Sequence, residues 1–232
     1  MDFAFGDTST KRNTGPSKQW TERELEEELK KLDAKIEEQK AQAGDVEVRD
    51  AILDKAVFLK QEARDYPEAE KVFRLAYDKS GGASKKMEIL FEVLLMNLEK
   101  FDLDAVKKDV ATCKQLVEEG ADWDKKNKLK IFEGVYCMLI RDLPRAAELF
   151  LSSISTFTCT ELMDYKDFVF YAVVTAMVTQ ERKVIRKEVV HSPDILAVIR
   201  DIPFLRQYLE SLYNCEYKSF FEAFVEIIDA IR

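Results

Sequence analysis

Apolar residues recur at steps of three and four along most of this chain, with polar residues in the positions between them. This is the period of an amphipathic α-helix, which turns one apolar face toward a core. Two such patterns meet at Arg141–Pro144 within the stretch 122–171. Because the link is so short, the two helices are expected to fold back as an antiparallel pair. Asp142 is placed to cap the second helix, and Pro144 stands in its first turn, where a missing N–H is tolerated.

The same period predicts helices along the rest of the chain. Residues 164–179 are apolar nearly all round, so we expect neighbours on both sides of this helix. Residues 182–190 are highly charged and are expected to form a short helix or a connector. The other predictions are helices over 20–43, about 85–98 and 217–231, a helix pair between Val46 and Ser80, a helix after Asp102, and helix starts at Ser192 and Asp201.

The turns between the predicted helices recur at a nearly fixed spacing. Ala69, Ala105 and Ala146 each follow such a turn, 36 and 41 residues apart, and Phe220 comes 74 residues later, or two periods of 37. One helix pair per period of this length is typical of tetratricopeptide-like repeats. The sequence therefore predicts an all-α fold, a tetratricopeptide-like α-solenoid of antiparallel helix pairs.

The first predicted helix has a narrow apolar stripe on an otherwise charged surface. Thr21 and Glu24 fit a capping box at its start. Such a helix buries little, so it either packs along one edge of the domain or docks on a partner. Residues 1–19 before it are polar and are expected to form a flexible N-terminal arm. The candidate partner contacts at this end are Trp20, Leu25 and Leu29.

The last predicted helix, residues 217–231, has an apolar stripe that is wide for a terminal helix. A solenoid normally presents a polar face at each end. We therefore expect the chain to continue beyond Arg232, and we expect an exposed apolar patch or self-association at this end. The candidate partner contacts on this helix are Phe221, Phe224 and Ile228.

Charge and hydropathy narrow the function classes. The formal net charge of −8 argues against nucleic acid or an anionic membrane as a partner, because both attract positive protein surface. The longest apolar run, residues 168–178, is shorter than the roughly 20 residues that a helix needs to cross a bilayer. The N-terminus lacks the apolar core of a signal peptide. These features favour a soluble intracellular protein.

Residues with reactive or metal-binding side chains form no familiar pattern. Cysteines 113, 137, 159 and 215 lack the close pairing of zinc or redox sites, so we interpret them as reduced and mostly buried thiols. The single histidine, His191, has no partners at metal-ligand spacing and is interpreted as a surface loop residue. A Cys–His nucleophile pair is the alternative. No catalytic, cofactor-binding or metal residue is predicted, and the chain is not expected to be an enzyme.

Acidic residues at 118–124 are followed directly by a run of lysines at 125–130. The acids lack the alternating ligands of an EF-hand, so helix capping by Asp122 or Asp124 is the interpretation. The lysines are interpreted as a solvated helix face, with a partner contact or a nucleic-acid patch as the alternatives.

Several blocks of the sequence together carry a specific resemblance to one protein family. The most distinctive are IRDLPRAAELF, STFT and ELMDYKDFV within residues 134–170. Further blocks are residues 29–36, 47–51, 76–79, 116–124 and 206–215. On these residues, about 22–225 of the chain resemble the family of regulatory particle non-ATPase subunit seven in the lid of the 26S proteasome. The first subunit of the COP9 signalosome is the related alternative.

The resemblance implies a right-handed helical-repeat domain followed by a winged-helix PCI module, which would lie beyond residue 232. We therefore expect a flexible arm at 1–19, a charged helix at 20–44, and a helical-repeat domain at 45–232 truncated before that module. The family implies contacts with other lid subunits and the ATPase ring inside a hetero-oligomer, located in the cytoplasm and nucleus. It has no catalytic residues to carry over.

The expected function is that of a non-catalytic structural subunit that scaffolds ubiquitin-dependent protein degradation through protein–protein contacts. Membership of the signalosome, or of a translation-factor PCI scaffold that acts near nucleic acid, is the first rival, and a contiguous basic stripe would favour the nucleic-acid version. The second rival is an enzyme built on helical repeats. It requires a deep polar pocket around His191, and an exposed His191 would contradict it.

Overall fold

The computed structural model describes residues 20–42 and 44–231. In these ranges the chain forms α-helices joined by short links and contains no strand. The all-α, tetratricopeptide-like class of consecutive antiparallel helix pairs is therefore confirmed, while the right-handed sense stays a prediction. The arm expected at 1–19 lies outside the described residues.

Contacts among the described residues divide the chain into two units, and each is treated by itself. The first unit ends at Lys126 and the second begins at Asn127. The domain boundary expected between residues 44 and 45 stays a prediction. Residues on both sides of it belong to the first unit.

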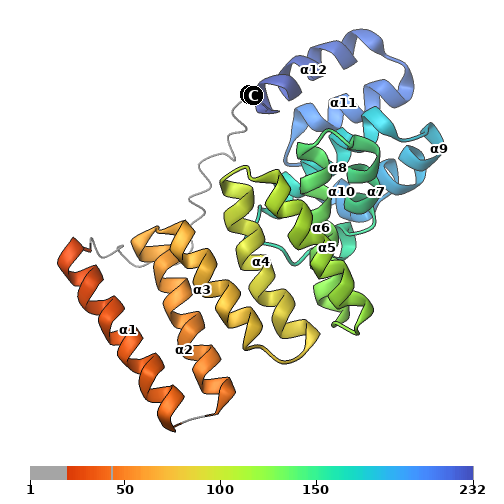
Figure 1. Cartoon of the computed structure of the whole chain (residues 1–232). Coiled ribbons are helices and arrows are strands. Elements are labelled where there is room, and N and C mark those ends of the chain that lie inside the picture. Colours follow the sequence, from red (N-terminus) through yellow and green to blue (C-terminus); the bar gives the residue numbers. More distant parts are fainter. Residues whose placement is uncertain (1–19, 43, 232) are drawn as a thin grey trace. The chain divides into compact units, whose positions relative to one another are not determined.

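In the first unit, the helices up to Glu118 each pack on the next one along the chain (Figure 1). A π-helical turn, Leu59–Ala63, extends the second helix and was not expected from the pattern. The helices are α1 (Glu22–Gln42), α2 (Asp45–Phe58), α3 (Tyr66–Asp78), α4 (Ala83–Glu99), α5 (Leu103–Glu118) and the start of α6 (Trp123–Leu139).

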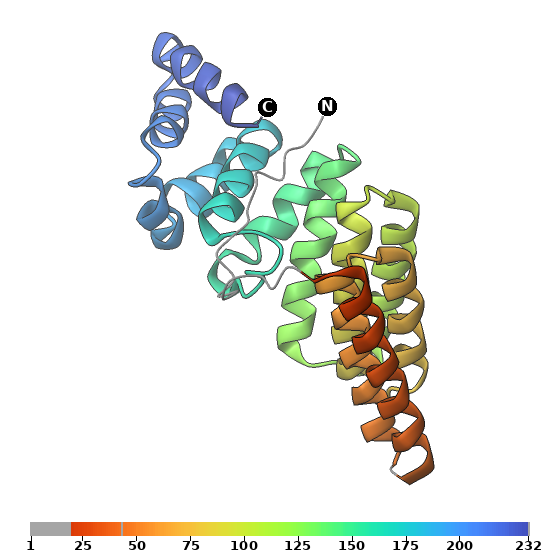
Figure 2. The same ribbon diagram turned by 90° about the vertical axis from the view of Figure 1, so that its left-hand side faces the viewer.

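The second unit contains the rest of α6 and the helices that follow it. Its last two helices form an antiparallel pair, drawn in the darker blues in Figures 1 and 2. The charged segment 182–190 is a short helix continued by a second π-helical turn, Ile185–Val190. The helices are α7 (Leu143–Leu151), α8 (Tyr165–Thr179), α9 (Arg182–Val184), α10 (Pro193–Ile199), α11 (Pro203–Asn214) and α12 (Tyr217–Ile231).

A left-handed residue other than glycine ends the preceding helix at four of the links between described helices. At the α4–α5 link, Phe101 has φ 56°, and its N–H donates to the Leu98 carbonyl at 3.1 Å. The Asp102 N–H donates to the Asn97 carbonyl at 3.0 Å, which completes a Schellman motif. The residues with the same left-handed conformation at the other links are Arg64, Arg141 and Cys215.

The residue after the left-handed position often starts the next helix. The side chains of Asp65, Asp102 and Asp142 accept hydrogen bonds from the backbone N–H three residues later, at 3.2, 3.0 and 3.4 Å. The capping role predicted for Asp142 is confirmed, and Pro144 lies in the first turn of α7 as expected. One short link therefore ends one helix and caps the next.

The left-handed residues also correct the register of the repeat. They are 37, 40 and 74 residues apart, and the fifth residue after each is Ala69, Val106, Ala146 or Phe220. The prediction that Ala105 matches Ala69 was therefore one residue off. Val106 is fully buried, whereas Ala105 is only half-buried. Both are apolar, so the spacing of apolar residues alone did not distinguish them.

The core of the first unit is one apolar cluster shared by its first four helices. Ile36 of α1, Ala56 of α2, Phe73 of α3 and Val93 of α4 all belong to it. Phe73 is 1% exposed. Burial of this kind supplies the main favourable term in folding, at roughly 25 cal/mol per Å² of apolar area.

Aromatic rings fill the core of the second unit, where α6 and α7 approach closely. A Cβ built on Gly134 would lie 2.5 Å from the ring of Phe150, so only glycine lets the ring pack there. Phe150 in turn packs edge-on against Phe168 of α8, with 5.4 Å between ring centroids. Glycine at position 134 therefore brings α6, α7 and α8 together.

Candidate functional site

Trp20, the first predicted contact residue, is half-buried against the first unit. Its indole Nε1–H donates to the Glu62 carboxylate at 2.6 Å, and its ring packs edge-on against Phe58 at 5.4 Å. Both partners lie at the C-terminal end of α2 and its π-helical extension. Trp20 therefore attaches the start of α1 to its own unit.

The two predicted leucines on α1 are also half-buried. Leu29 packs against the core cluster of the first unit. Ion pairs flank this contact, because Lys55 of α2 reaches Asp33 at 2.6 Å and Lys35 reaches Asp54 of α2 at 2.7 Å. The edge-helix interpretation of α1 is confirmed by these contacts, and a partner contact of Leu25 or Leu29 stays a prediction.

The predicted capping box at the start of α1 is present. The Thr21 N–H donates to Glu24 at 2.9 Å, and the Glu24 N–H donates back to the Thr21 hydroxyl at 3.4 Å. On the surface of the same helix, Lys31 forms an ion pair with Glu28 at 2.8 Å. Exposed side chains of this kind change partners at little cost.

One face of α12 is anchored on α11 by stacked aromatic rings. Tyr208 of α11 stacks on Phe220 and Phe224 at 4.9 and 6.2 Å between centroids. Ala223 and Ile227, on the same side of the helix, are 2% and 1% exposed. Phe224, a predicted contact residue, therefore packs mainly inside the unit.

A neighbouring apolar face of α12 is exposed and forms a continuous stripe. We call Tyr217, Phe221, Val225 and Ile228 the α12 stripe; they are 61%, 61%, 56% and 46% exposed. Their steps of four, four and three place them on one side of the helix. Two of them, Phe221 and Ile228, were predicted contacts, whereas Tyr217 and Val225 were missed. Counting back and forward by four from Phe221 finds both.

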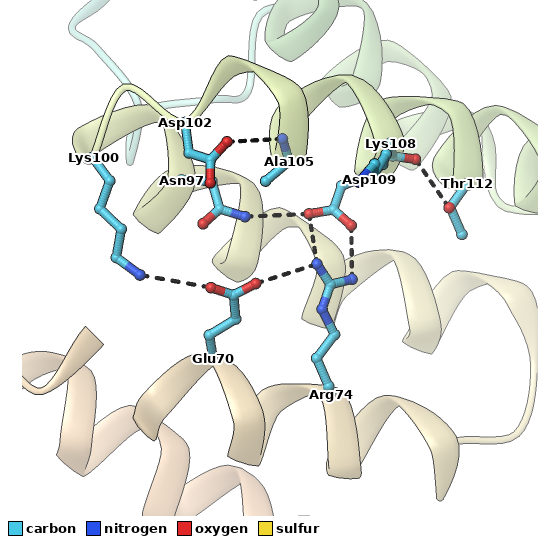
Figure 3. Close-up of polar contacts among 9 residues, drawn as sticks. All are labelled: Glu70, Arg74, Asn97, Lys100, Asp102, Ala105, Lys108, Asp109 and Thr112. Atoms are coloured by element: carbon cyan, nitrogen blue, oxygen red, sulfur yellow. Dashed lines mark hydrogen bonds and ion pairs between the residues drawn. The ribbon is translucent and has the colours of Figure 1, made fainter. Parts of the chain in front are cut away.

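A polar network joins the first helix pair of the first unit to the second (Figure 3). The Arg74 guanidinium of α3 donates to both carboxylate oxygens of Asp109 on α5, at 2.7 and 2.8 Å. The Asn97 amide of α4 donates to the same carboxylate at 3.3 Å. Glu70 lies 3.4 Å from Arg74 and 3.6 Å from Lys100. Charges alternate through the network, so each carboxylate faces at least one cation.

This network is structural rather than catalytic in its geometry. Burial acts to lower the pKa of the Arg74 guanidinium, but the hydrogen bonds and charge of Asp109 outweigh it and raise that pKa. The Asp109 side chain is only 4% exposed and its oxygens already accept three hydrogen bonds. Such a buried, satisfied pair fixes how α3, α4 and α5 align, since any other alignment would leave a charge unpaired.

The sequence also matches a known protein family. The sequence profile described as 26S proteasome subunit RPN7 matches residues 18–188, which is most of the chain. The chain belongs to the RPN7 family of 26S proteasome subunits. The resemblance seen in the sequence blocks is therefore confirmed. The profile match ends before α10, so the α12 stripe of this RPN7 family member lies outside it.

Individual relatives support the RPN7 assignment. The 26S proteasome non-ATPase regulatory subunit 6 homolog of Arabidopsis thaliana is 44% identical over 207 residues, which cover 89% of this chain and 53% of that protein. The 26S proteasome non-ATPase regulatory subunit 6 of Oryza sativa subsp. japonica is 41% identical, with coverages of 90% and 53%. The 26S proteasome regulatory subunit RPN7 of Saccharomyces cerevisiae is 28% identical, with coverages of 87% and 48%. The chain spans about half the length of the curated relatives it matches.

The structure of this RPN7 family member tests the alternative of an enzyme built on helical repeats, which requires a deep polar pocket around His191. His191 is exposed at the end of the second π-helical turn, which is the outcome that contradicts that rival. Burial raises the pKa of the Cys113 and Cys159 thiols to about 12, so both stay protonated near neutral pH. Cys215 differs from the expectation of burial, because it is exposed at the α11–α12 link. Within residues 20–42 and 44–231, no group of three or more potential ligands is arranged to hold a metal ion.

Two lysines of the run at the start of α6 form ion pairs within their own units. Lys125 lies 2.5 Å from Glu88, and Lys128 forms an ion pair with Glu161. The solvated-face interpretation was therefore wrong for these two lysines, which are held by carboxylates from elsewhere in their own units.

No helix in the described part of the chain combines the length and the apolar character that a membrane crossing requires.

Proposed function

We propose that this chain is a structural, non-catalytic part of the 26S proteasome regulatory particle lid, which acts in ubiquitin-dependent protein degradation through contacts with other proteins. The observation that carries the proposal is the RPN7 profile match over residues 18–188. The names of the relatives, which call them non-ATPase regulatory subunits of the 26S proteasome, support it.

The proposed mechanism is geometric. Helix pairs locked to each other by apolar packing and by the Arg74–Asp109 network form a stiff element that holds neighbouring subunits in place. Such an element needs an exposed surface that a partner can cover. The α12 stripe contains more exposed large apolar side chains than any other described helix, and its four side chains fit a protein contact.

The proposed partners are other lid subunits and the ATPase ring, within a hetero-oligomer, and the proposed location is the cytoplasm and nucleus. These follow from the family resemblance. The net charge of −8 gives no support to nucleic acid as a partner.

The test is affinity purification of tagged residues 1–232 from cells, with quantitative mass spectrometry of the captured proteins. We expect lid and ATPase subunits of the proteasome to be enriched above a tag-only control. Recovery of signalosome or translation-factor subunits without proteasome subunits would assign the chain to a different complex.

A pair of variants on one helix tests the role of the α12 stripe. Phe221→Glu places a charge in the stripe, and Glu226→Lys changes a charge on the polar side of α12. We expect Phe221→Glu to reduce proteasome recovery and Glu226→Lys to leave it unchanged. Equal recovery with both variants would remove the stripe from the contact surface.

A further inference from the structure

A pocket of about 280 Å³ lies in the second unit, where the C-terminal ends of α8 and α11 meet the start of α12. Its most buried lining residues are Met177 of α8 and Ile185 of the second π-helical turn, each 8% exposed. Leu212 and Tyr213 of α11 line it as well and are half-buried. The volume is just below the usual range for whole small-molecule ligands, so it suits one large apolar side chain.

The pocket is accessible from solvent. Arg182, Cys215 and Tyr217 all line it and are all exposed. The Tyr217 side chain is 61% exposed, and its ring and that of Tyr213 offer the flat apolar surface against which aromatic and aliphatic side chains pack. A segment of another protein can therefore reach the buried part of the pocket from outside.

Arg182 is the only charged residue among the described residues that line the pocket. Its guanidinium donates to the Tyr213 carbonyl at 2.6 Å and to the Cys215 sulfur at 3.8 Å, and it lies 5.0 Å from the centroid of the Tyr213 ring. These contacts hold the guanidinium at the pocket but use only two of its five N–H groups. In the part of the chain that the structure describes, Arg182 has no carboxylate partner, so it can still donate to one from outside.

The charged residues directly next to the lining residues in the chain also favour an anion. Together with Arg182 they comprise more cations than acids, and all of them are exposed. The cations are Arg182, Lys183, Arg186 and Lys218, and the acids are Glu181 and Glu216.

More distant charges do not reverse this balance. Glu222, one turn beyond Lys218 on α12, reduces the positive excess without cancelling it. The helix ends add about half a charge each, negative for α8 and α11 and positive for α12. Their sum is smaller than the remaining formal charge, so the pocket favours a negatively charged group.

We propose that this pocket binds a short segment of a partner protein in which one large apolar side chain lies next to an aspartate or glutamate. The apolar side chain packs against Met177, Ile185 and Leu212, and the carboxylate accepts hydrogen bonds from Arg182. A lysine or arginine in place of the acid would put like charge against Arg182. This binding site is additional to the proposed function and does not depend on which complex the chain joins.

Cys215 provides a direct reporter of occupancy. It is the exposed one of the four cysteines, whereas Cys113, Cys137 and Cys159 are buried. Alkylation of the folded chain with iodoacetamide, followed by mass spectrometry, therefore measures access to the pocket. A peptide present at ten times its Kd should slow the alkylation of Cys215 about tenfold, because only about a tenth of the pockets are then free.

The test uses the whole chain of residues 1–232 and a displayed library of short random peptides. Enriched peptides are synthesised with a fluorophore, and their Kd is measured by fluorescence anisotropy. We expect them to combine Asp or Glu with a neighbouring Phe, Tyr, Trp, Leu or Met, and to protect Cys215 from alkylation. A library that yields no binder, only basic binders, or only binders that leave the alkylation rate unchanged overturns the proposal.

A pairwise comparison tests the contact with Arg182. Exchanging the acid of an enriched peptide for Asn or Gln, or changing Arg182→Gln, should each raise the Kd about tenfold, and the two changes together should cost little more than one. The matched control is Arg200→Gln, which alters an exposed arginine that does not line the pocket and should leave the Kd within about twofold. Fully additive effects of the two changes would show that Arg182 does not meet the acid, and would overturn the proposal.

A steric block locates the apolar contact. Reaction of Cys215 with N-phenylmaleimide places a bulky group in the pocket and is expected to abolish peptide binding. The same reagent should not alter binding to the Cys215→Ser variant, which has no thiol at that position. Peptides that still bind the blocked chain lie elsewhere and contradict the proposal. Thermal unfolding of each protein is the folding control; if Arg182→Gln unfolds the second unit, the acid-to-amide peptides and the block decide the result on the unaltered sequence.

Discussion

The first and last described helices, α1 and α12, each pack chiefly on one neighbour, yet their outer faces have opposite character. The outer face of α1 is charged, with Glu26, Glu27 and Lys30 exposed. The outer face of α12 carries the stripe, with Phe221 61% exposed. Each helix therefore belongs to its own unit through one apolar face, but only α12 has a second.

The difference lies in how much apolar surface each outer face leaves in water. An edge helix with a polar outer face is complete in water, because its single apolar face is already covered. A helix with a second apolar face keeps that surface in contact with water until another molecule or another segment of the same protein covers it. The contrast points to the α12 side as the surface where assembly removes the most apolar area.

The largest expected effect is on the stability of α12. It compares two neighbouring isoleucines, one on the buried face of the helix and one on its exposed face. Ile227 is 1% exposed and Ile228 is 46% exposed. We expect Ile227→Ala to lower the opening free energy of the α11–α12 pair by about 2–5 kcal/mol, because it leaves a cavity. Ile228→Ala should cost less than about 0.5 kcal/mol.

Hydrogen exchange read by mass spectrometry over peptides from α11 and α12 measures both values. The first unit serves as the internal control, since both variants lie in the second unit. Equal losses for the two alanine variants would show that the stripe is already covered by the chain itself.

The second prediction concerns self-association. In the absence of partners, two copies of the chain can cover their stripes against each other, so we expect concentration-dependent association. The double variant Phe221→Glu, Ile228→Glu should weaken it about tenfold or more, because each association would bury four added charges.

Sedimentation velocity over a range of concentrations measures the association. The matched control changes the outer face of α1, where Glu26→Lys and Glu27→Lys should have no effect on it. Association that is lost with the α1 variant and kept with the α12 variant would reverse the comparison between the two helices.

The sequence correctly predicted helix ends and turns that depend on residues close together in the chain. The turn at Arg141–Pro144, the cap by Asp142 and the capping box of Thr21 with Glu24 all depend on residues a few positions apart. Their energetics are set within one turn of helix, so a single sequence is sufficient.

The sequence did not predict features that depend on distant partners. Arg74 and Asp109 are 35 residues apart, and each looks like an ordinary charged residue on its own helix. The pocket lined by Met177 and Leu212 likewise arises only when α8 and α11 are brought together. Neither has a local pattern that could reveal it.

The contact residues predicted on α12 were only partly correct for the same reason, because the buried side of this helix is decided by another helix. The apolar pattern covers more than half of the helix, and which part faces α11 is decided by Tyr208, whose ring stacks on Phe220 and Phe224. Phe224 was therefore grouped with Phe221, although Phe224 is half-buried against Tyr208 and Phe221 is exposed. The steps of four that link Tyr217, Phe221 and Val225 were available but ambiguous without α11.

The smallest expected effect concerns what holds α1 in place. Asp33 of α1 reaches Lys55 of α2 at 2.6 Å, and the two side chains are 55% and 19% exposed. A pair this close to solvent is expected to contribute about 0.2–1 kcal/mol, and salt should screen it. We therefore expect Asp33→Asn to increase exchange in α1 slightly at low salt and to have almost no effect near 1 M salt, where the Debye length is about 3 Å.

Hydrogen exchange over α1 at the two salt concentrations measures this effect, and Asp33→Asn keeps the shape of the side chain. The cost of Ile227→Ala on α12 provides the contrast, because apolar burial does not weaken with added salt in this way. If the Asp33→Asn cost persisted at high salt, the pair would be shielded from solvent. The edge of α1 would then be closed by a contact as strong as the aromatic stack under α12, and the comparison would hold only for their outer faces.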